Sequence, residues 1–303
     1  MFKLSLTGNR HMKPILVHIH IFYAELWPEL KLCLSHISEY PYELYVTLVQ
    51  ENEALVNDIL ETKPNAHILI VKNKGYDVGP FIHVLQQVNL QDYSYIIKLH
   101  TKRNIVHISE PGWTYNSPYY LKGSLWREYL LSFLRKENLE KCLKAFEESP
   151  TLGMVNNYRL IVPEFHKKEK YLRTLQERAF KLLNKVGLYP RKSVYVKGTM
   201  FIVRAHLMQK IKDLGLTIDS FPVPDAEHKE NMAHELEIAL GTCVDAQNYR
   251  ISDVFTPDVE SKMKWGTILG RLRRKLYKNY ISPKGRHVIK IAHILIWNAR
   301  TAK

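Results

Sequence analysis

Two short polar segments of this chain carry residue types that bind anions, and each follows an apolar stretch. Their candidate binding residues are Asn73, Gly75, Asp77, His100 and Lys102. A lysine side chain can stabilise the negative charge of a diphosphate, and a glycine can adopt the positive φ of a tight turn. The Asp77 carboxylate can accept hydrogen bonds from a sugar or ribose hydroxyl. The two segments therefore predict an anion-binding site at the end of a strand.

Both segments also have a structural interpretation. Asp77 can cap the helix that is expected to begin at Gly79 and Pro80, a role compatible with a place at the edge of a pocket. Lys102 and Arg103 can be solvated cations of a loop. The residue types alone leave these alternatives open.

Residues 233–237 carry the best candidate for a general base. His234 and Glu237 are three residues apart and share one face of the expected helix, whereas Glu235 points elsewhere. A carboxylate or imidazole can remove a proton from an attacking hydroxyl group, but solvated helix charge is the usual role of such residues. No second histidine stands four residues after His234, so this is not the metal motif HExxH. A nearby loop carries a weaker alternative site, formed by Asp225, Glu227 and His228.

Gly198 and Thr199 interrupt an otherwise apolar, strand-like segment. A glycine at such a position often marks the close approach of a backbone or a ligand. A simple β-bulge is the structural alternative.

Two histidines fall in the first apolar segment of the chain. His18 and His20 share one face of the expected strand, because alternate residues of a strand point the same way. We expect His18 to be structural. His20 and Tyr23 could approach a nucleobase at the carboxyl end of the strand, although a histidine in such a strand is more often part of the core.

Strand-like and helical segments alternate through the first hundred residues. Strands are expected over residues 15–23, 42–49, 67–71, 93–99, 152–156 and 193–204. Helices are expected over residues 25–37, 51–61, 80–88, 124–134, 137–148, 164–186, 207–214 and 231–240. The alternation predicts right-handed βαβ units in an α/β fold with a mainly parallel central sheet flanked by helices.

Six segments in a fixed order resemble the rhamnan synthesis protein F family, which comprises glycosyltransferases of bacterial surface polysaccharides. They are NKGYDVGPF, YIIKLHTKR, the pair Trp126-Arg127, LGMV, KGTMFIVRA and AHELE. The resemblance runs from about Ile15 to Tyr249 and implies a GT-A-like fold. It also implies transfer of a sugar, with rhamnose as one candidate, from a dTDP-, UDP- or GDP-activated donor.

The resemblance assigns roles to the candidate residues. In the GT-A arrangement, the strand ending at Leu99 leads to an Asp-x-Asp motif that holds a divalent cation. This chain has His100-Thr101-Lys102 instead, which implies a donor site without metal ligands or cofactor, although a divalent cation remains an alternative. Glu237 is implied as the base with His234 beside it. The implied donor-binding residues are Asn73, Gly75, Asp77, His100, Lys102, Gly198 and Thr199.

The positive charge of the chain is concentrated at its C-terminal end. Of a net charge of +14, residues 262–303 contribute 12 Lys and Arg and no Asp or Glu. The basicity therefore belongs to a tail, which argues against nucleic-acid binding by the whole chain. Apolar residues in this tail follow a helical period: Trp265, Ile268, Leu269, Leu272, Leu276 and Tyr280. Together with a second apolar piece over residues 288–297, they predict basic amphipathic helices on an anionic membrane surface. Docking of the tail onto the protein's own body is the alternative.

We therefore expect a GT-A-like domain over residues 1–260 and a membrane-associating tail over residues 261–303. The scattered cysteines Cys33, Cys142 and Cys243, and no sign of a signal peptide or spanning segment, favour a cytoplasmic protein peripheral on the inner face of the membrane. Its expected partners are the nucleotide-sugar donor, a polyprenyl-diphosphate-linked glycan and the membrane, with no nucleic acid. The rivals are a non-catalytic nucleotide-sugar-binding scaffold of a polysaccharide assembly complex and a nucleic-acid-binding protein that uses the basic tail.

Overall fold

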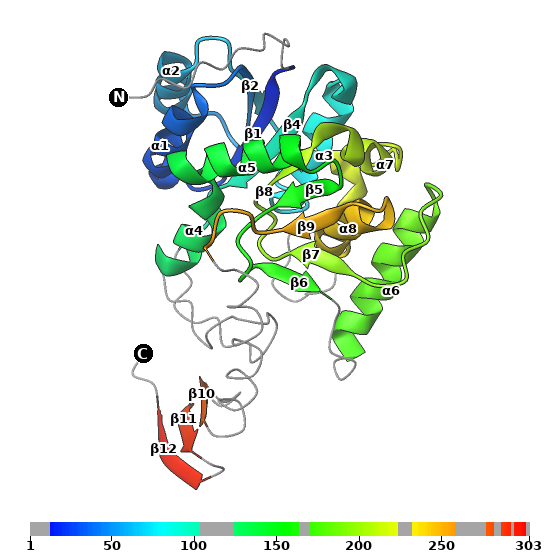
Figure 1. Ribbon diagram of the computed structural model, residues 1–303. Coiled ribbons are helices and arrows are strands. Elements are labelled where there is room, and N and C mark those ends of the chain that lie inside the picture. The colour runs from blue at the N-terminus through cyan, green and yellow to red at the C-terminus, as the bar shows by residue number, and fades with distance from the viewer. Residues whose placement is uncertain are drawn as a thin grey trace.

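The computed structural model of the chain describes residues 13–103, 124–163, 170–223, 232–257, 277–281, 286–291 and 294–300. Its centre is a seven-stranded sheet with helices on both faces (Figure 1). Helices α1 (Trp27–Ile37) and α5 (Lys136–Glu148) pack together on one face. Helices α3 (Val78–Gln87), α7 (Gln209–Lys212) and α8 (Met232–Ala246) pack together on the other.

The N-terminal part of the sheet consists of four parallel strands, as the alternation of segments predicted. They are β1 (Ile15–Ile21), β2 (Tyr42–Leu48), β3 (His67–Ile70) and β4 (Tyr95–His100). Helix α1, helix α2 (Glu53–Thr62) and helix α3 connect them in sequence. Every residue of β1 and β4 is buried, because helices cover both faces of the sheet there.

The rest of the sheet comes from the second half of the chain. Its strands are β5 (Leu152–Val155), β8 (Phe201–Arg204) and β9 (Arg250–Ser252). Other elements that follow β4 are α4 (Ser124–Leu131), β6 (Ile161–Pro163), α6 (Lys170–Asn184) and β7 (Val194–Val196). Short 3-10 helices cover Ala24–Leu26, Leu90–Asp92, Ser132–Leu134, Ala205–Met208 and Ile218–Ser220. The strand order is β3-β2-β1-β4-β8-β5-β9, and β8 runs antiparallel to its neighbours β4 and β5. The α/β fold with a mainly parallel central sheet is therefore confirmed.

The strand expected over residues 193–204 is two strands that belong to different sheets. β7 pairs with β6 in a small antiparallel sheet, whereas β8 enters the central sheet. The chain turns between them at Gly198 (φ +81°) and Thr199 (φ +49°). The interruption is therefore a turn with left-handed backbone and not a β-bulge.

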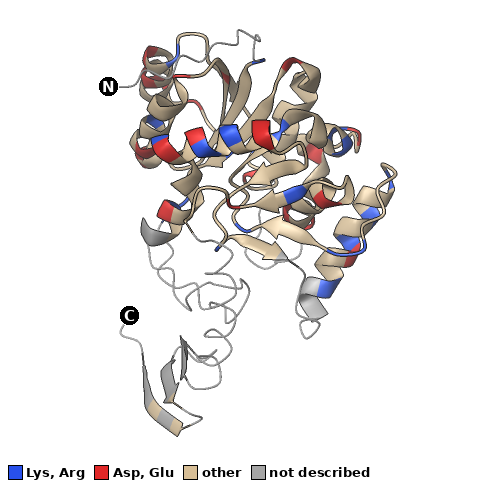
Figure 2. Ribbon diagram, viewed as in Figure 1, with Lys and Arg blue, Asp and Glu red and all other residues tan. Residues whose placement is uncertain are grey.

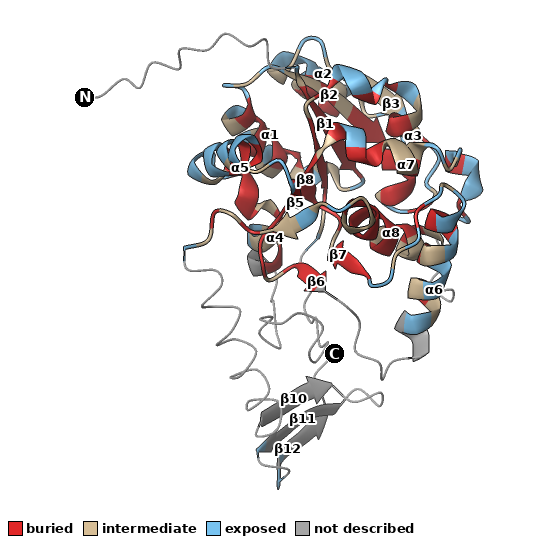
Figure 3. Cartoon of the chain, turned by 45° about the vertical axis from the view of Figure 1, so that its right-hand side comes forward, coloured by how far each residue is buried: buried red, intermediate tan, exposed pale blue. Residues whose placement is uncertain are grey.

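Burial and charge follow the layers of the fold. Figure 3 shows the central strands as buried and the outward faces of the helices as exposed. Charged residues gather on those outer helix surfaces (Figure 2), as expected when apolar helix faces cover the sheet. Among the few polar side chains that are fully buried, His18 and Lys98 lie opposite each other on β1 and β4.

The C-terminal segment differs from the sequence prediction. Its described residues form a three-stranded antiparallel sheet, β10 (Tyr277–Ile281), β11 (Arg286–Ile291) and β12 (Ile294–Arg300). The predicted amphipathic helices are therefore wrong for these residues, because isoleucine and valine, which are frequent here, favour strands. Residues 258–276, with the domain boundary at 260 and most of the first predicted helix, lie outside the described residues.

Within the described ranges, no helix is both long enough and apolar enough to cross a bilayer.

Candidate active site

A cavity of about 390 Å³ opens at the carboxyl ends of β1 and β4. These strands are neighbours in the sheet, but the chain passes from β1 to β2 and β3 on one side before it returns to β4 on the other. Ligands of α/β proteins bind at such a reversal of strand order, because the connecting loops diverge there and leave a crevice. Four of the predicted binding residues line the cavity: Asn73, Asp77, His100 and Lys102. Its other lining residues are His20, Phe22, Tyr23, Tyr76, Thr101 and Arg103.

Thr101 lines the cavity and connects the end of β4 to the end of β1 through hydrogen bonds. Its backbone N–H donates to the His20 carbonyl, and its hydroxyl oxygen accepts the N–H groups of Phe22 and Tyr23, each at 3.0 Å. These bonds fix the segment after β1 to the end of β4. Arg103 lies over the Tyr23 ring, 4.2 Å from its centroid, and pairs with Glu25 at 2.7 Å. The Arg103 side chain is exposed, so this pair contributes little to stability.

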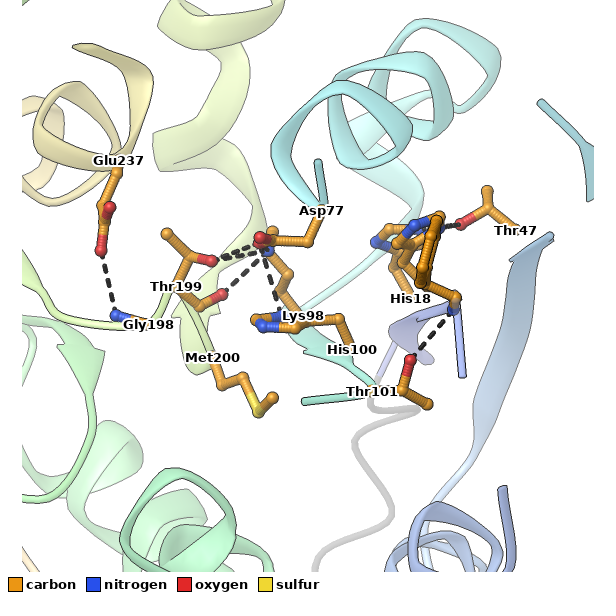
Figure 4. A network of polar contacts seen from close by, with 12 residues as sticks. His18, Thr47, Asp77, Lys98, His100, Thr101, Gly198, Thr199, Met200 and Glu237 are labelled. Carbon is orange, nitrogen blue, oxygen red and sulfur yellow. Dashed lines mark hydrogen bonds and ion pairs between the residues drawn. The ribbon is translucent and has the colours of Figure 1, made fainter. Parts of the chain in front are cut away.

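Asp77 lies at the N-terminus of α3 but does not cap it through its side chain. Its carboxylate Oδ2 instead accepts a hydrogen bond from Lys98 Nζ at 2.6 Å and another from the Thr199 hydroxyl. Figure 4 shows Lys98, Thr199 and His100 converging on this carboxylate. Burial alone would raise the pKa of Asp77, but His100, Lys98 and Thr199 hold it well below its usual range. Asp77 is therefore ionised.

Lys98 is fully buried in β4 and satisfies its ammonium group within the protein. Besides Asp77, Nζ donates to the Thr199 carbonyl oxygen at 3.0 Å and to the Thr199 hydroxyl oxygen at 3.1 Å. Burial lowers the pKa of Lys98, and the Asp77 charge opposes that shift. Because the Lys98 ammonium contacts three acceptors, one of which is the ionised carboxylate, we assign Lys98 and Asp77 as an ion pair.

His100 is buried beside Asp77, with Nδ1 at 3.4 Å from the Asp77 Oδ2 atom. The geometry is not that of a hydrogen bond, and neither ring nitrogen has a hydrogen-bond partner among the described residues. Burial lowers the pKa of His100 well below its ordinary value; the Asp77 charge opposes that shift, and Lys98 and Lys102 add to it. The imidazole is therefore neutral near pH 7, so Lys98 is the cation that keeps Asp77 ionised there.

The two histidines of β1 share one partner. His18 Nε2 and His20 Nδ1 each lie 3.0 Å from the buried Thr47 hydroxyl. Burial lowers the pKa of His20 to about 4 and that of His18 well below its ordinary value. His18 stacks on Phe81 in the core, as expected of a structural residue, whereas His20 reaches the cavity.

The two predicted glycines both adopt positive φ. Gly75 has a φ of +69°, and a Cβ atom there would lie 2.5 Å from the Phe221 ring. At Gly198 a Cβ atom would lie 2.6 Å from Leu130, so the close approach comes from a helix side chain. Thr199 also has positive φ, which is unfavourable for a β-branched residue, and its contacts with Asp77 and Lys98 hold it there.

Glu237 faces the same network from α8. Its Oε1 atom accepts the Gly198 N–H at 3.0 Å (Figure 4). Burial raises the pKa of Glu237, the Gly198 bond lowers it, and Asp77 raises it further, with a net rise. Its helix neighbour Glu235 pairs with Arg178 at 3.4 Å, so it points elsewhere as predicted.

His234 lies on the same helix and contacts the ring of Tyr76 edge-on, with the centroids 5.7 Å apart. Tyr76 lines the cavity, so His234 supports the cavity wall on that side. His234 and Glu237 are three residues apart on α8, so both lie on one face of that helix.

The predicted residues thus gather around one cavity, although they come from four parts of the chain. Gly198, Thr199 and Glu237 are not among the residues that line the cavity, but Thr199 contacts Asp77 and Gly198 contacts Glu237. Lys98 was not among the predicted site residues. A lysine inside an apolar strand was the available signal, because a buried ammonium group requires a partner. The alternative site at Asp225, Glu227 and His228 lies outside the described residues.

A divalent cation fits the described part of the cavity poorly. Over the described ranges, no group of three or more His, Cys, Asp and Glu side chains could hold a metal ion. Asp77 supplies a carboxylate to the cavity wall, but Lys98 and Thr199 already occupy its Oδ2 atom. The oxygen-rich donor set that Mg²⁺ or Mn²⁺ requires is not formed by these residues.

The chain is similar to known proteins over most of its length. A family model described as rhamnan synthesis protein F matches residues 3–249. Two curated proteins from Xanthomonas campestris pv. campestris, strain B100 and a second strain, are both named "Uncharacterized protein WxcX" and are each 23% identical over 188 residues. The match covers 60% of this chain and 24% of each relative, so the chain spans about a quarter of their length. The crystal structure of S. aureus TarS 1–349 aligns with a TM-score of 0.40 and 13% identity, over 80% of this chain and 58% of that chain.

Proposed function

We propose that this chain, which belongs to the rhamnan synthesis protein F family, transfers a sugar from a nucleotide diphosphate to a lipid-linked glycan of a bacterial surface polysaccharide, such as an O-antigen or capsule. Membership of the family supports a glycosyltransferase of polysaccharide synthesis. The donor, the acceptor and the roles of individual residues are part of the proposal. Rhamnose activated by dTDP is the first donor to test, since the family is described by rhamnan synthesis; UDP- and GDP-sugars come next.

The cavity at the ends of β1 and β4 carries this proposal. Lys102 and Arg103 line it beside Tyr23 and Tyr76. Cationic side chains stabilise a diphosphate, and aromatic rings pack against a flat nucleobase. We assign Lys102 to the leaving diphosphate, because Arg103 already pairs with Glu25. The neutral His100 would donate a hydrogen bond to the donor, since its ring nitrogens have no protein partner among the described residues.

The same residues support a transfer that needs no divalent cation. In a metal-dependent site, free carboxylates hold the cation that neutralises the leaving diphosphate. Here the charge of Asp77 is balanced by Lys98, and of the two cations that line the cavity, Arg103 pairs with Glu25. Lys102 would take over the neutralising role directly.

Glu237 is our candidate for the general base. The Gly198 N–H holds Oε1 in place, which leaves Oε2 to accept the proton of an attacking hydroxyl group. A raised pKa makes a carboxylate a stronger base, and burial raises that of Glu237. His234, one helical turn before Glu237, would help to orient the acceptor through its contact with Tyr76, which lines the cavity.

We also propose that the C-terminal segment binds an anionic membrane on the cytoplasmic side, where a polyprenyl-diphosphate-linked acceptor would lie. The charge of this segment supports the proposal, because residues 262–303 carry 12 Lys and Arg and no acidic residue. Ile291, Ile294 and Ile296 are also exposed on β11 and β12. Apolar side chains among cations are suited to the boundary between headgroups and acyl chains.

A transfer assay tests the proposed function. The purified chain is mixed with dTDP-rhamnose, or with a UDP- or GDP-sugar, and with a polyprenyl-diphosphate-linked glycan, in the presence and absence of excess EDTA. We expect transfer from one donor and the same rate in EDTA. Loss of transfer in EDTA would overturn the metal-independent part. Donor binding without transfer would favour the alternative function, a non-catalytic nucleotide-sugar-binding scaffold.

A further inference from the structure

We propose that Lys98 is a positioning residue that neutralises Asp77 from behind the cavity wall, so that the cavity can accept a diphosphate. The inference rests on the proposed nucleotide-sugar donor and explains how an anion can bind next to a carboxylate. Asp77 lines the cavity, and its side chain is 18% exposed. Lys98 is 0% exposed and does not line the cavity.

The need for such a residue follows from the charges around Asp77. The neighbouring imidazoles of His18, His20 and His100 are neutral near pH 7, because burial disfavours their charged form. Lys102 and Arg103 line the same cavity, but Arg103 pairs with Glu25, and Glu237 adds a further carboxyl group on α8. Without Lys98, the carboxylate of Asp77 would offset the charge of Lys102 and repel a diphosphate in the same cavity.

The geometry fits a residue that balances charge and does not touch the ligand. The Lys98 ammonium has three protein acceptors, which are the Asp77 Oδ2 atom and the carbonyl and hydroxyl oxygens of Thr199. Its donor capacity is therefore used within the protein. A ligand in the cavity would meet the carboxylate of Asp77 but not the ammonium group behind it.

The ammonium also supports the turn that holds Glu237. Both acceptor atoms on Thr199 belong to a residue with a φ of +49°, and the preceding Gly198 donates its N–H to Glu237. Lys98 thus connects the wall of the donor cavity to the candidate base through one turn of the chain. Loss of the ammonium would relax both contacts at once.

The test measures the affinity of variants of the full chain for dTDP, UDP and GDP by isothermal titration calorimetry. Lys98→Met removes the charge with a side chain of similar length, and we expect affinity to fall on the order of tenfold. The double variant Asp77→Asn/Lys98→Met removes both charges but keeps a side-chain oxygen at position 77 that can accept a hydrogen bond from a ligand hydroxyl. We therefore expect its affinity to return to within about threefold of the wild-type chain. Lys136→Met is the matched control, because it removes an exposed lysine paired with Glu39 on a helix away from the cavity.

Each outcome decides between a charge effect and a structural effect. Recovery in the double variant supports the inference, because Asp77→Asn removes the uncompensated charge but does not restore the contacts of the Lys98 ammonium with Thr199. Equal affinity of Lys98→Met and the wild-type chain, or equal losses in the single and double variants, would overturn it and leave the proposed function intact. If Lys98→Met fails to fold by circular dichroism, the double variant decides alone, and a tenfold loss there overturns the inference. No binding of any of the three probes by the wild-type chain would overturn the proposed function and the inference with it.

Discussion

Lys98 Nζ lies 2.6 Å from Asp77 Oδ2, and this contact joins the buried centre of the sheet to the wall of the cavity. Asp77 precedes α3, whereas Lys98 lies within β4, so the pair brings together two of the segments that frame the proposed donor site. The same ammonium reaches Thr199, next to the Gly198 N–H that Glu237 accepts.

Lys102→Ala should weaken donor binding, because Lys102 is proposed to stabilise the diphosphate. We expect the KM for the donor to rise on the order of tenfold at low salt, with a smaller difference at high salt as screening reduces the contribution of the lysine. Steady-state kinetics at two salt concentrations measure this. Lys136→Ala, which removes an exposed lysine of α5, is the control and should leave the KM unchanged. Wild-type KM in Lys102→Ala would remove Lys102 from the site.

Gly75→Ala should destabilise the fold through the turn that precedes Asp77. The added Cβ would lie 2.5 Å from the Phe221 ring at a φ of +69°. Gly215 has a φ of +64° and open space around it, so Gly215→Ala carries the backbone strain without the clash. We expect Gly75→Ala to lose about 1–3 kcal/mol more unfolding free energy than Gly215→Ala, measured by urea denaturation. Equal losses would mean that Phe221 moves aside freely.

Stability should fall as the pH drops below the ordinary histidine pKa. His18, His20 and His100 have lowered pKa values in the folded protein, with that of His20 at about 4. Between the unfolded value of 6.5 and these folded values, the unfolded chain binds more protons, so the stabilisation is present above pH 6.5 and is lost as the pH falls. Each such histidine contributes a slope of up to about 1.4 kcal/mol per pH unit. Urea denaturation between pH 7 and pH 5 should show a smaller slope for His20→Asn, and an unchanged slope would contradict this origin.

The C-terminal isoleucines should contribute to membrane binding. We expect the full chain to float with vesicles of phosphatidylglycerol and phosphatidylcholine but not with phosphatidylcholine alone. Ile294→Ser/Ile296→Ser should weaken that binding on the order of tenfold, because it removes two exposed apolar side chains from β12. Leu32→Ser, at an exposed leucine of α1, should have no effect. Failure of the wild-type chain to float would favour docking of the tail onto the protein's own body.

The central sheet was predictable because its strands are continuous apolar runs separated by amphipathic helices. The turn glycines and the carboxylate of Asp77 could also be found, since residue type and position after a strand are local signals. The partners of Asp77 could not be found in this way. Lys98 is 21 residues from Asp77 and 101 residues from Thr199. The pairing of β4 with β8 brings Lys98 close to Thr199, and no local pattern reveals that pairing.

The prediction of helices for the C-terminal segment was wrong for a different reason. Its apolar residues match a helical period in places and a strand period in others, so the sequence alone does not decide between them. The pairing of Tyr277 with Ile291, and of Ile291 with Ile294, depends on neighbouring strands that a single segment does not reveal.

The proposed function depends most directly on Glu237 as the base of a sugar transfer. The decisive measurement compares donor binding and transfer to a polyprenyl-diphosphate-linked glycan in the wild-type chain and in Glu237→Gln, with Glu235→Gln as the control on the same helix. The amide of glutamine can still accept the Gly198 N–H, so we expect donor affinity to be unchanged and the transfer rate to fall by about 10²-fold or more. Wild-type transfer by Glu237→Gln, or donor binding without transfer by the wild-type chain, would contradict the account.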